Sequence, residues 1–399
     1  MARTLKYDKV LFTAALLLVC AGVVMVYSAS ALLALERYQQ PYLFLSKQVM
    51  WAVLGLAVLA VVMRVDYRTY RNEAFVWALI ALAVVTLVGV LFSAPVNGSR
   101  RWFGFGGLGI QPSELAKIVC VLFTALILER RMHRIDEPSY SVLPVAVVVG
   151  VMAILILVEP DFGTAISLLV IVAIMFFAAG LHYRYFIGTL LVMAPTIYLV
   201  MVSKHYRLDR LLAFLDPWAD PLGDGFQLIQ SLIAVGTGGV FGRGLMEGVQ
   251  KLFYVPEPHT DFIFAVIGEE LGLVGATVTL ACFCLIAWRG VRITLRAPDS
   301  FGAFVALGVT SMIVVQAFIN MSVVLGLLPT KGLPLPLVSA GGSSLLVSLL
   351  GMGVLLNISQ QATGSFDVGM LGGAVTKREK GPRKLQVSPA GRMAASRFG

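Results

Sequence analysis

One carboxylate in the sequence stands where a general base would be useful, at the first residue of a long apolar stretch. Asp261 follows Pro256 and Pro258, which enforce an extended approach, and residues 262–264 are aromatic and aliphatic. A carboxylate at an apolar boundary has a raised proton affinity, which suits it to take a proton from a substrate. An Asp before a helix also commonly serves as its N-cap, so this stretch alone leaves both roles open.

A second set of charges lies at the start of another apolar stretch. Pro112 suits the first turn of a helix, and Glu114 and Lys117 are then three residues apart on one face. At the edge of an apolar region the two ions neutralise each other while leaving the Lys117 ammonium at a cavity. A purely structural ion pair is the alternative interpretation.

Further polar residues interrupt apolar stretches, where they are costly. Residues 159–161, Glu-Pro-Asp, form a tight turn between two apolar runs. Glu269 and Glu270 lie one turn inside an apolar stretch, so at least one of them must face the protein interior. Gln316 and Asn320 are four residues apart and share a helix face, where hydrogen bonds between helices and contact with a ligand are both open.

Several segments of the chain contain Pro and Gly. Three prolines within 328–336 and the pair Gly341–Gly342 exclude a regular helix, so we expect a re-entrant loop that lines a cavity. Residues 236–244 are rich in Gly but lack the preceding strand and the Gly-Lys-Ser/Thr ending of a nucleotide site. Residues 216–224 carry three Asp, but their spacing is not that of an EF-hand, so metal binding is not predicted there.

The elements that must position these residues belong to a membrane protein. Of the 399 residues, 58% are hydrophobic and only 13% are charged, about half the charge of a typical soluble domain. Such a composition excludes disorder, coiled coil and collagen. The net charge of +9 could indicate nucleic acid, but in so apolar a chain it favours orientation in a bilayer, and no nucleic-acid partner is expected. The four cysteines lie in apolar runs without a C-x-x-C spacing.

The apolar stretches predict an all-α polytopic membrane protein with about ten transmembrane helices. The short stretches leave nine or eleven spans open. We expect one transmembrane domain over 1–358, a large extracytoplasmic loop with half-helices at 204–262, and a basic, disordered cytoplasmic tail at 359–399. The predicted spans are 10–31, 43–63, 74–92, 112–129, 143–158, 162–180, 185–203, 263–288, 301–325 and 343–358.

The distribution of positive charge predicts the orientation. Most of the 31 Lys and Arg residues fall in the terminal segments and in the loops on the same side, so both termini are expected in the cytoplasm. Topology does not explain the cations on the other side, which makes them candidates for an anionic ligand, with a solvated loop face as the alternative. These are Arg100, Arg101, Lys117, Lys204, Arg207, Arg210, Arg243 and Lys251.

Seven of these segments occur in an order that resembles the SEDS family of cell-wall proteins (shape, elongation, division, sporulation). Within that family, residues 328–332, Leu-Pro-Thr-Lys-Gly, are similar to the cell-division branch rather than the elongation branch. Ala340 departs from a common Tyr, and residues 246–248 differ from the usual small polar residues. The matching segments are 98–103, 111–117, 159–164, 214–218, 256–262, 268–272 and 341–344.

The resemblance implies a peptidoglycan glycosyltransferase that polymerises lipid II outside the bacterial cytoplasmic (inner) membrane, at the division septum, releasing undecaprenyl pyrophosphate. It implies that Asp261 is essential for catalysis. It also implies a divalent cation, Mg²⁺ or Mn²⁺, whose ligands the sequence does not locate. The implied partners are a class B penicillin-binding protein (an FtsI-like transpeptidase) and division regulators of the FtsQ, FtsL and FtsB type.

The residues fit this chemistry, because attack of a sugar hydroxyl on an anomeric carbon with a pyrophosphate leaving group needs one base and a cationic cradle. We therefore assign Asp261 as the base and Glu114 as the residue that orients Lys117. A set of cations, the pyrophosphate cradle, is expected to hold the leaving group. A lipid II flippase, a division scaffold and the elongation branch are the alternatives. No inverted repeat is apparent, and the polar residues favour one side of the membrane, which weighs against a flippase. The cradle would consist of Lys117, Arg100, Arg101, Arg210 and Lys331.

Overall fold

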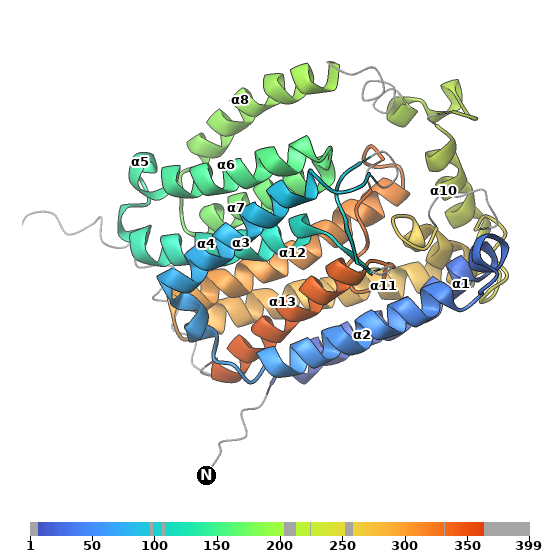
Figure 1. The fold of residues 1–399 in the computed structure, drawn as a ribbon, viewed down its shortest axis with the longest axis horizontal. Coiled ribbons are helices and arrows are strands. Elements are labelled where there is room, and N and C mark those ends of the chain that lie inside the picture. Colours follow the sequence, from blue (N-terminus) through green and yellow to red (C-terminus); the bar gives the residue numbers. More distant parts are fainter. Residues whose placement is uncertain are drawn as a thin grey trace, which may run out of the picture. The chain divides into compact units, whose positions relative to one another are not determined.

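The structure is a computed structural model that describes residues 7–95, 99–105, 108–202, 213–223, 225–251, 258–330 and 332–362. Each of the ten predicted apolar stretches coincides with a helix (Figure 1). These helices are α1 (Lys9–Tyr38), α2 (Leu43–Val62), α3 (Glu73–Val90), α4 (Pro112–Arg131), α6 (Leu143–Val158), α7 (Phe162–Ala178), α8 (Tyr183–Val202), α11 (Ile263–Arg296), α12 (Ser300–Val324) and α13 (Gly342–Gln361).

Within the described residues, six helices are long and apolar enough to cross a membrane, namely α1, α2, α3, α11, α12 and α13. The helix α6, the helix α7 and the half-helix α10 (Phe226–Thr237) are shorter and apolar. The predicted class of all-α polytopic membrane protein is confirmed, whereas the count of ten spans stays a prediction. Most of the tail at 359–399 lies outside the described residues.

Smaller elements connect these helices. The strands β1 (Phe103–Phe105) and β2 (Leu108–Ile110) form an antiparallel pair that the sequence did not predict. A short helix, α5 (Pro138–Ser141), precedes α6, and three 3-10 turns span Tyr67–Arg71, Met132–Arg134 and Pro217–Ala219. The helix α10 agrees with the predicted half-helices of the long loop.

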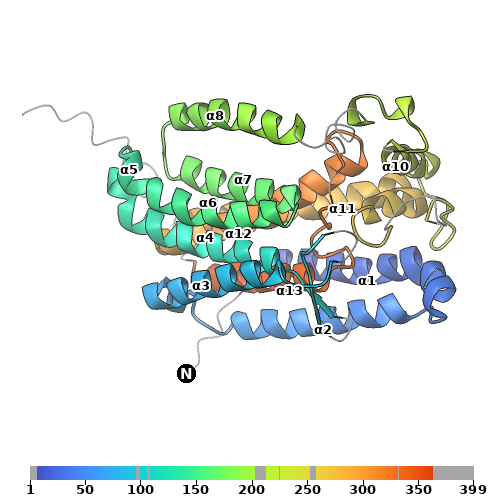
Figure 2. The same ribbon diagram turned by 45° about the horizontal axis from the view of Figure 1, so that its top comes forward.

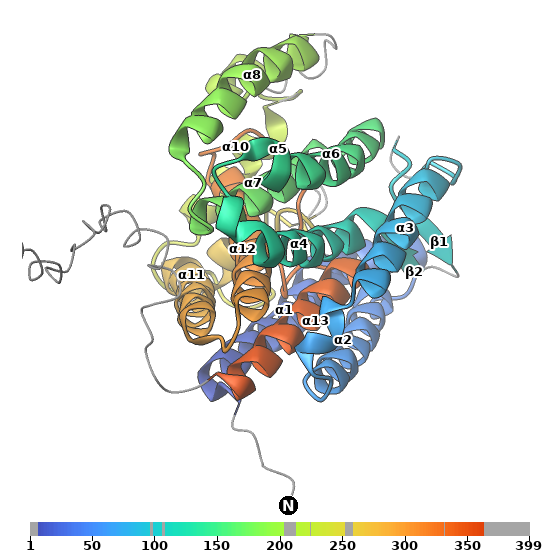
Figure 3. The same ribbon diagram turned by 90° about the vertical axis from the view of Figure 1, so that its left-hand side faces the viewer.

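The most buried helices are α4, α12 and α13. The helix α13 packs mainly against α2 and also contacts α12, and α12 packs against α11, α4 and α7 (Figure 3). The helix α8 runs along the outside, beside α7, where Phe186 contacts Phe177 with ring centroids 5.9 Å apart (Figure 2). The centre of the bundle is therefore formed by helices that carry the polar residues singled out above.

The two ends of the described bundle meet on one side. The backbone N–H of Asp8 donates to Ser359 Oγ at 3.2 Å, and Arg289 Nε donates to the Asp8 carboxylate at 2.7 Å. The beginning of α1, the end of α13 and the C-terminal end of α11 therefore lie together. This contact agrees with the prediction that both termini are on the same side of the membrane.

The helix α11 is interrupted near the two acids that the sequence placed inside it. Gly272 has a φ of +66°, outside the helical region. In a continuous helix the amides of residues 273 and 274 would donate to the carbonyls of 269 and 270. Here those four groups bond to residues 239–244 instead. The bonds are Arg243 N to Glu269 O (3.0 Å), Gly244 N to Glu270 O (3.1 Å), Leu273 N to Gly239 O (2.9 Å) and Val274 N to Val240 O (3.1 Å).

The segment 238–251, hereafter the inserted loop, thus completes the hydrogen bonding of the broken helix. Two of its glycines have a steric reason, because a Cβ on Gly238 would lie 1.9 Å from the Gly268 carbonyl oxygen and one on Gly242 would lie 2.0 Å from that of Glu270. Close backbone approach thus explains these two glycines of the motif at 236–244 without phosphate binding.

Candidate active site

Glu114 and Lys117 form a buried ion pair at the start of α4. Lys117 Nζ lies 2.9 Å from Glu114 Oε1, and both side chains are only 2% exposed. Lys117 Nζ also donates to Gln316 Oε1 on α12. A lone buried charge would be costly, and here the two ions and the amide compensate one another. The predicted pairing of Glu114 with Lys117 is therefore present in the structure.

Asp261 lies just before α11 and is held through the backbone of its neighbours. Its carbonyl oxygen accepts a hydrogen bond from Asn320 Nδ2 at 2.7 Å. The carbonyls of the two preceding residues are also bonded: Ser339 Oγ donates to Thr260 at 2.6 Å, and the amide of Ala340 donates to His259 at 2.9 Å. The segment 259–261 is thus docked on the irregular chain between α12 and α13.

The carboxylate of Asp261 faces this irregular segment. A Cβ on Gly332 would lie 2.8 Å from Asp261 Oδ2, so only a glycine leaves this space open. The residue preceding α11 is Phe262, and this helix has no side-chain N-cap. The interpretation of Asp261 as the N-cap of α11 is therefore not supported, and its role as a base stays a prediction.

The irregular segment 332–341 has the buried placement expected of a re-entrant loop. Leu333, Leu335 and Leu337 are each 1% exposed although the backbone is not helical. Ser339 Oγ accepts from the amide of Leu335 at 2.7 Å, so a side chain replaces part of the missing helical bonding. The segment brings backbone carbonyls to the neighbourhood of Asp261.

Arg100 and Arg101 bind backbone carbonyls at the ends of two helices. Arg100 donates to the carbonyl of Leu91, after α3, at 2.9 Å. Arg101 donates to Glu159 at 3.1 Å and to Pro160 at 2.9 Å, after α6. Both guanidiniums thus compensate helix C-termini, and their predicted contact with pyrophosphate stays a prediction. Arg210 and Lys331, the other predicted cradle residues, lie outside the described residues.

Two other extracytoplasmic cations are paired with acids rather than gathered around an anion site. Lys251 Nζ lies 2.6 Å from Glu270 Oε1, and Ser28 Oγ of α1 donates to the same carboxylate at 2.7 Å. Arg243 lies 3.9 Å from Glu269, whose Oε1 also accepts the amide of residue 249 at 2.8 Å. Both acids face inward, and the predicted contact of Lys251 and Arg243 with an anionic ligand stays a prediction.

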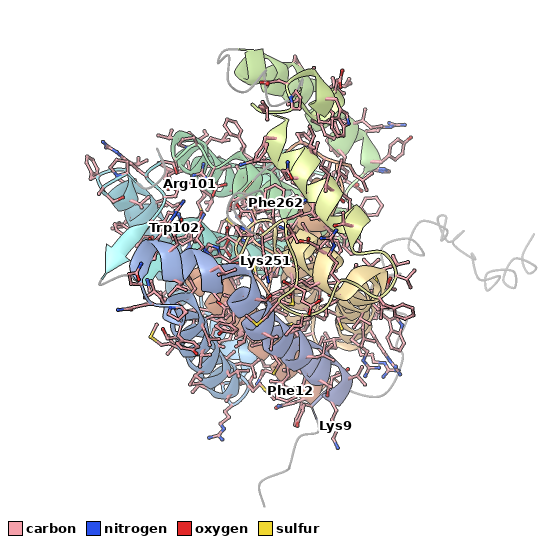
Figure 4. The ribbon with its side chains drawn as sticks, turned by 90° about the vertical axis from the view of Figure 1, so that its right-hand side faces the viewer. Lys9, Phe12, Arg101, Trp102, Lys251 and Phe262 are labelled. Carbon is pink, nitrogen blue, oxygen red and sulfur yellow. The ribbon has the colours of Figure 1, made fainter. Side chains whose placement is uncertain are left out.

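In the view of Figure 4, Phe262 and Lys251 lie near the centre of the picture, with Arg101 and Trp102 to their left. Lys9 and Phe12, at the start of α1, lie at the lower edge.

The cluster of Ser28, Lys251 and Glu270 was missed from the sequence, where the only signal for Ser28 was a small polar residue within an apolar run.

The turn between α6 and α7 holds two acids that differ in their hydrogen bonding. Asp161 accepts from Gln111 Nε2 at 2.9 Å and from Thr164 Oγ1 at 2.8 Å. Neither carboxyl oxygen of Glu159 has a hydrogen-bond partner among the described residues, and the side chain is fully buried. Burial, followed by the nearby Asp161 charge, raises the pKa of Glu159 to about 8, against the opposing effect of Arg101. Glu159 is therefore protonated at neutral pH.

This state gives the protein a testable pH dependence. Because the pKa of Glu159 is higher in the folded protein (about 8) than its ordinary value of 4.5, the folded state holds the proton more tightly. The associated stability is fully present below pH 4.5 and is lost as the pH rises through 8. In Glu159→Gln we expect a melting temperature that declines less between pH 5 and about 8.5 than in the unmodified protein. Glu137→Gln, at an exposed carboxylate, is the control and should keep the original slope; equal slopes in all three proteins would contradict this assignment.

The divalent cation implied by the family resemblance finds no site in the described part of the chain. No three His, Cys, Asp or Glu side chains come together there to hold a metal ion. The carboxylates of Glu114 and Glu270 are each bound by a lysine instead. The ligands of the expected cation therefore stay unlocated in this part of the chain, and Mg²⁺ is commonly held by only one or two carboxylates together with substrate phosphates.

Residues 8–364 match the family described as "Cell cycle protein", whose profile is named for FtsW, RodA and SpoVE. The chain belongs to this family, the SEDS family. The SEDS chain is 44% identical over 363 residues to the "Probable peptidoglycan glycosyltransferase FtsW" of Geobacter sulfurreducens, covering 90% of this chain and 97% of that protein. It is 42% identical over 354 residues to "Stage V sporulation protein E" of Bacillus subtilis, covering 88% and 97% of the two chains.

Two solved structures share the fold of this SEDS protein. One belongs to a study described as "Structural coordination of polymerization and crosslinking by a peptidoglycan synthase complex", with a TM-score of 0.75, 32% identity and coverage of 90% of this chain and 100% of the other. The other is the rod shape determining protein RodA of Thermus thermophilus, with a TM-score of 0.67, 27% identity and coverage of 91% and 99%. The protein is accordingly a multi-pass membrane protein of this family.

Proposed function

We propose that this protein is a peptidoglycan glycosyltransferase that polymerises lipid II into glycan strands at the outer face of the bacterial inner membrane. The observation that carries the proposal is the arrangement around α12. The backbone of Asp261 and the ammonium of Lys117 are each bonded to a buried amide on this helix. A base and a cation held in one buried network are what a transfer from a pyrophosphate leaving group requires.

In the proposed reaction, Asp261 accepts the proton of the attacking sugar hydroxyl. The hydroxyl oxygen forms a bond to the anomeric carbon of the second sugar, and the bond from that carbon to the pyrophosphate oxygen breaks. The leaving group departs with the bonding electron pair as undecaprenyl pyrophosphate and needs charge stabilisation more than a proton. The reaction therefore requires one carboxylate rather than the two of glycoside hydrolysis.

Lys117 is the cation that the structure best supports for the leaving group. An ammonium has three N–H donors, of which Glu114 and Gln316 receive two. The third can donate to a phosphate oxygen while Glu114 keeps the ammonium in place. In this proposal Arg210 and Lys331 complete the cradle, and Arg100 and Arg101 contribute their charge from the ends of α3 and α6.

The cellular role belongs to the same proposal. Several relatives at 40–44% identity carry the name FtsW, which supports the cell-division branch and a place at the septum. The relative in a peptidoglycan synthase complex supports a working complex with a class B penicillin-binding protein. Regulators of the FtsQ, FtsL and FtsB type are the expected further partners, and Mg²⁺ or Mn²⁺ is the expected cation.

The proposal is tested by incubating the purified protein with its penicillin-binding partner, lipid II and a divalent cation. We expect glycan strands that a muramidase degrades, resolved by gel electrophoresis. A protein that makes no strands but moves lipid II across vesicle membranes would be a flippase. A protein that does neither would be a scaffold.

A further inference from the structure

The two amides on α12, Gln316 and Asn320, have no part in the reaction as written above. Both side chains are 2% exposed, and they are one helical turn apart on the same face of this helix. Because α12 packs against α4 and α11, this face lies between the helix that carries Lys117 and the helix that follows Asp261.

The amide of Asn320 joins Asp261 to the irregular segment. Its Nδ2 donates to the Asp261 carbonyl at 2.7 Å and to the Leu333 carbonyl at 2.7 Å. Both amide hydrogens are thus used, and the reverse orientation would place oxygen against oxygen. The side chain therefore has one defined orientation that fixes the backbone of residue 261 relative to α12.

The amide of Gln316 makes the matching connection on the next turn. Its Nε2 donates to the Pro334 carbonyl at 2.9 Å, and its Oε1 accepts from Lys117 Nζ. Each amide therefore bonds one of two consecutive carbonyls of the irregular segment and one functional residue. The rise of a helical turn, about 5.4 Å, separates the two connections.

A comparison with another buried amide distinguishes positioning from ordinary stabilisation. Asn357 on α13 is bonded at both ends: its Nδ2 donates to Met63 O at 2.9 Å, and its Oδ1 accepts from Tyr67 N at 3.0 Å. Asn320 Oδ1, in contrast, is buried with no hydrogen-bond partner among the described residues. Asn357 bonds residues 63 and 67, whereas Asn320 bonds the backbone of residue 261, so the two amides separate a role at the proposed site from ordinary stabilisation.

We propose that Gln316 and Asn320 are positioning residues that use one face of α12 to fix Asp261 and Lys117 at the spacing the transfer requires. The inference rests on the proposed function and deepens it. Neither amide is assigned a contact with the reacting atoms. They act through the backbone of residue 261 and the ammonium of residue 117. Loss of either connection should therefore affect the rate of the chemical step more than the affinity for lipid II.

The test uses the full chain in complex with its penicillin-binding partner and measures initial rates against lipid II concentration. Asn320→Leu should lower kcat about 10²-fold, the size expected for a small misplacement of a reacting group. Its KM should change by less than about threefold, because uniform substrate binding is retained. Asn320→Ser keeps one hydrogen-bond donor, so its kcat should lie between those of Asn320→Leu and the unmodified protein. Gln316→Met should show a smaller loss of kcat, because Lys117 keeps Glu114.

Asn357→Leu is the matched control, because it removes a buried amide that also bonds two backbone groups, at residues 63 and 67 instead of 261 and 333. We expect a comparable fall in melting temperature with kcat unchanged for the folded fraction. The proposal is overturned if folded Asn320→Leu keeps its kcat, if only its KM rises, or if Asn357→Leu loses kcat equally. Should Asn320→Leu not fold, the same criteria apply to Asn320→Ser. Failure of the unmodified complex to make strands would instead reject the proposed function itself.

Discussion

Replacement of Asp261 by Asn is expected to reduce polymerisation of lipid II by about 10²- to 10⁴-fold, the contribution typical of a general base. Asn has nearly the same shape and cannot accept the proton of the attacking hydroxyl. The variant keeps the bond from Asn320, which reaches the backbone carbonyl of residue 261. The measurement is the initial rate of strand formation, together with a melting curve.

Asp66→Asn serves as the control for this substitution. Asp66 is exposed and accepts the amide of Arg68 at 2.9 Å, a role that an Asn side chain performs equally well. We expect this variant to polymerise lipid II at the normal rate. An Asp261→Asn protein that is as active as the Asp66→Asn protein would exclude Asp261 as the base.

The second large effect is expected at the buried ion pair of α4. Lys117→Met leaves the Glu114 carboxylate buried without its cation, which typically destabilises a protein by about 3–5 kcal/mol. We also expect loss of polymerisation, because the leaving pyrophosphate loses its nearest supported cation. The free energy of unfolding in detergent and the rate of strand formation are measured on the same preparations.

The double variant Lys117→Met with Glu114→Gln separates the two roles of this pair. Removal of both charges should restore much of the stability, since no uncompensated ion remains, but it should not restore activity. Arg134→Met is a control at an exposed pair, where Arg134 lies 4.0 Å from Glu137 and more than half of each side chain is exposed. Its effect should be below about 1 kcal/mol. Full activity in the stable double variant would show that the pair is only structural.

The extent of sequence-based prediction differs between local and distant features. The ten helices could be predicted because each is specified by a continuous apolar run of its own residues. The ion pair of Glu114 and Lys117 could be predicted for the same reason, since both residues lie on one helix turn. The cost of a charge facing lipid predicted that at least one of Glu269 and Glu270 faces inward, and the structure buries both.

The partners of distant residues could not be predicted in this way. Lys251 meets Glu270 and Ser28 only because α1 and α11 pack together and the inserted loop returns to them. The shared face of Gln316 and Asn320 was evident from their spacing, but their bonds to the carbonyls of residues 261, 333 and 334 depend on tertiary packing. For the loop cations on the outer side, the sequence shows only a Lys or Arg in a loop. It does not distinguish whether that residue binds an anionic ligand, a backbone carbonyl or a carboxylate.

The insertion of residues 239–244 into the hydrogen-bond ladder of α11 has a consequence for how the chain is made. The ribosome synthesises these residues before α11, so their backbone groups have no permanent partner until the helix has entered the membrane. The helix in turn has unsatisfied groups near Gly272 until the loop arrives, and each such group is costly in a lipid environment. Neither segment is complete alone, so the final hydrogen bonding of each requires the other.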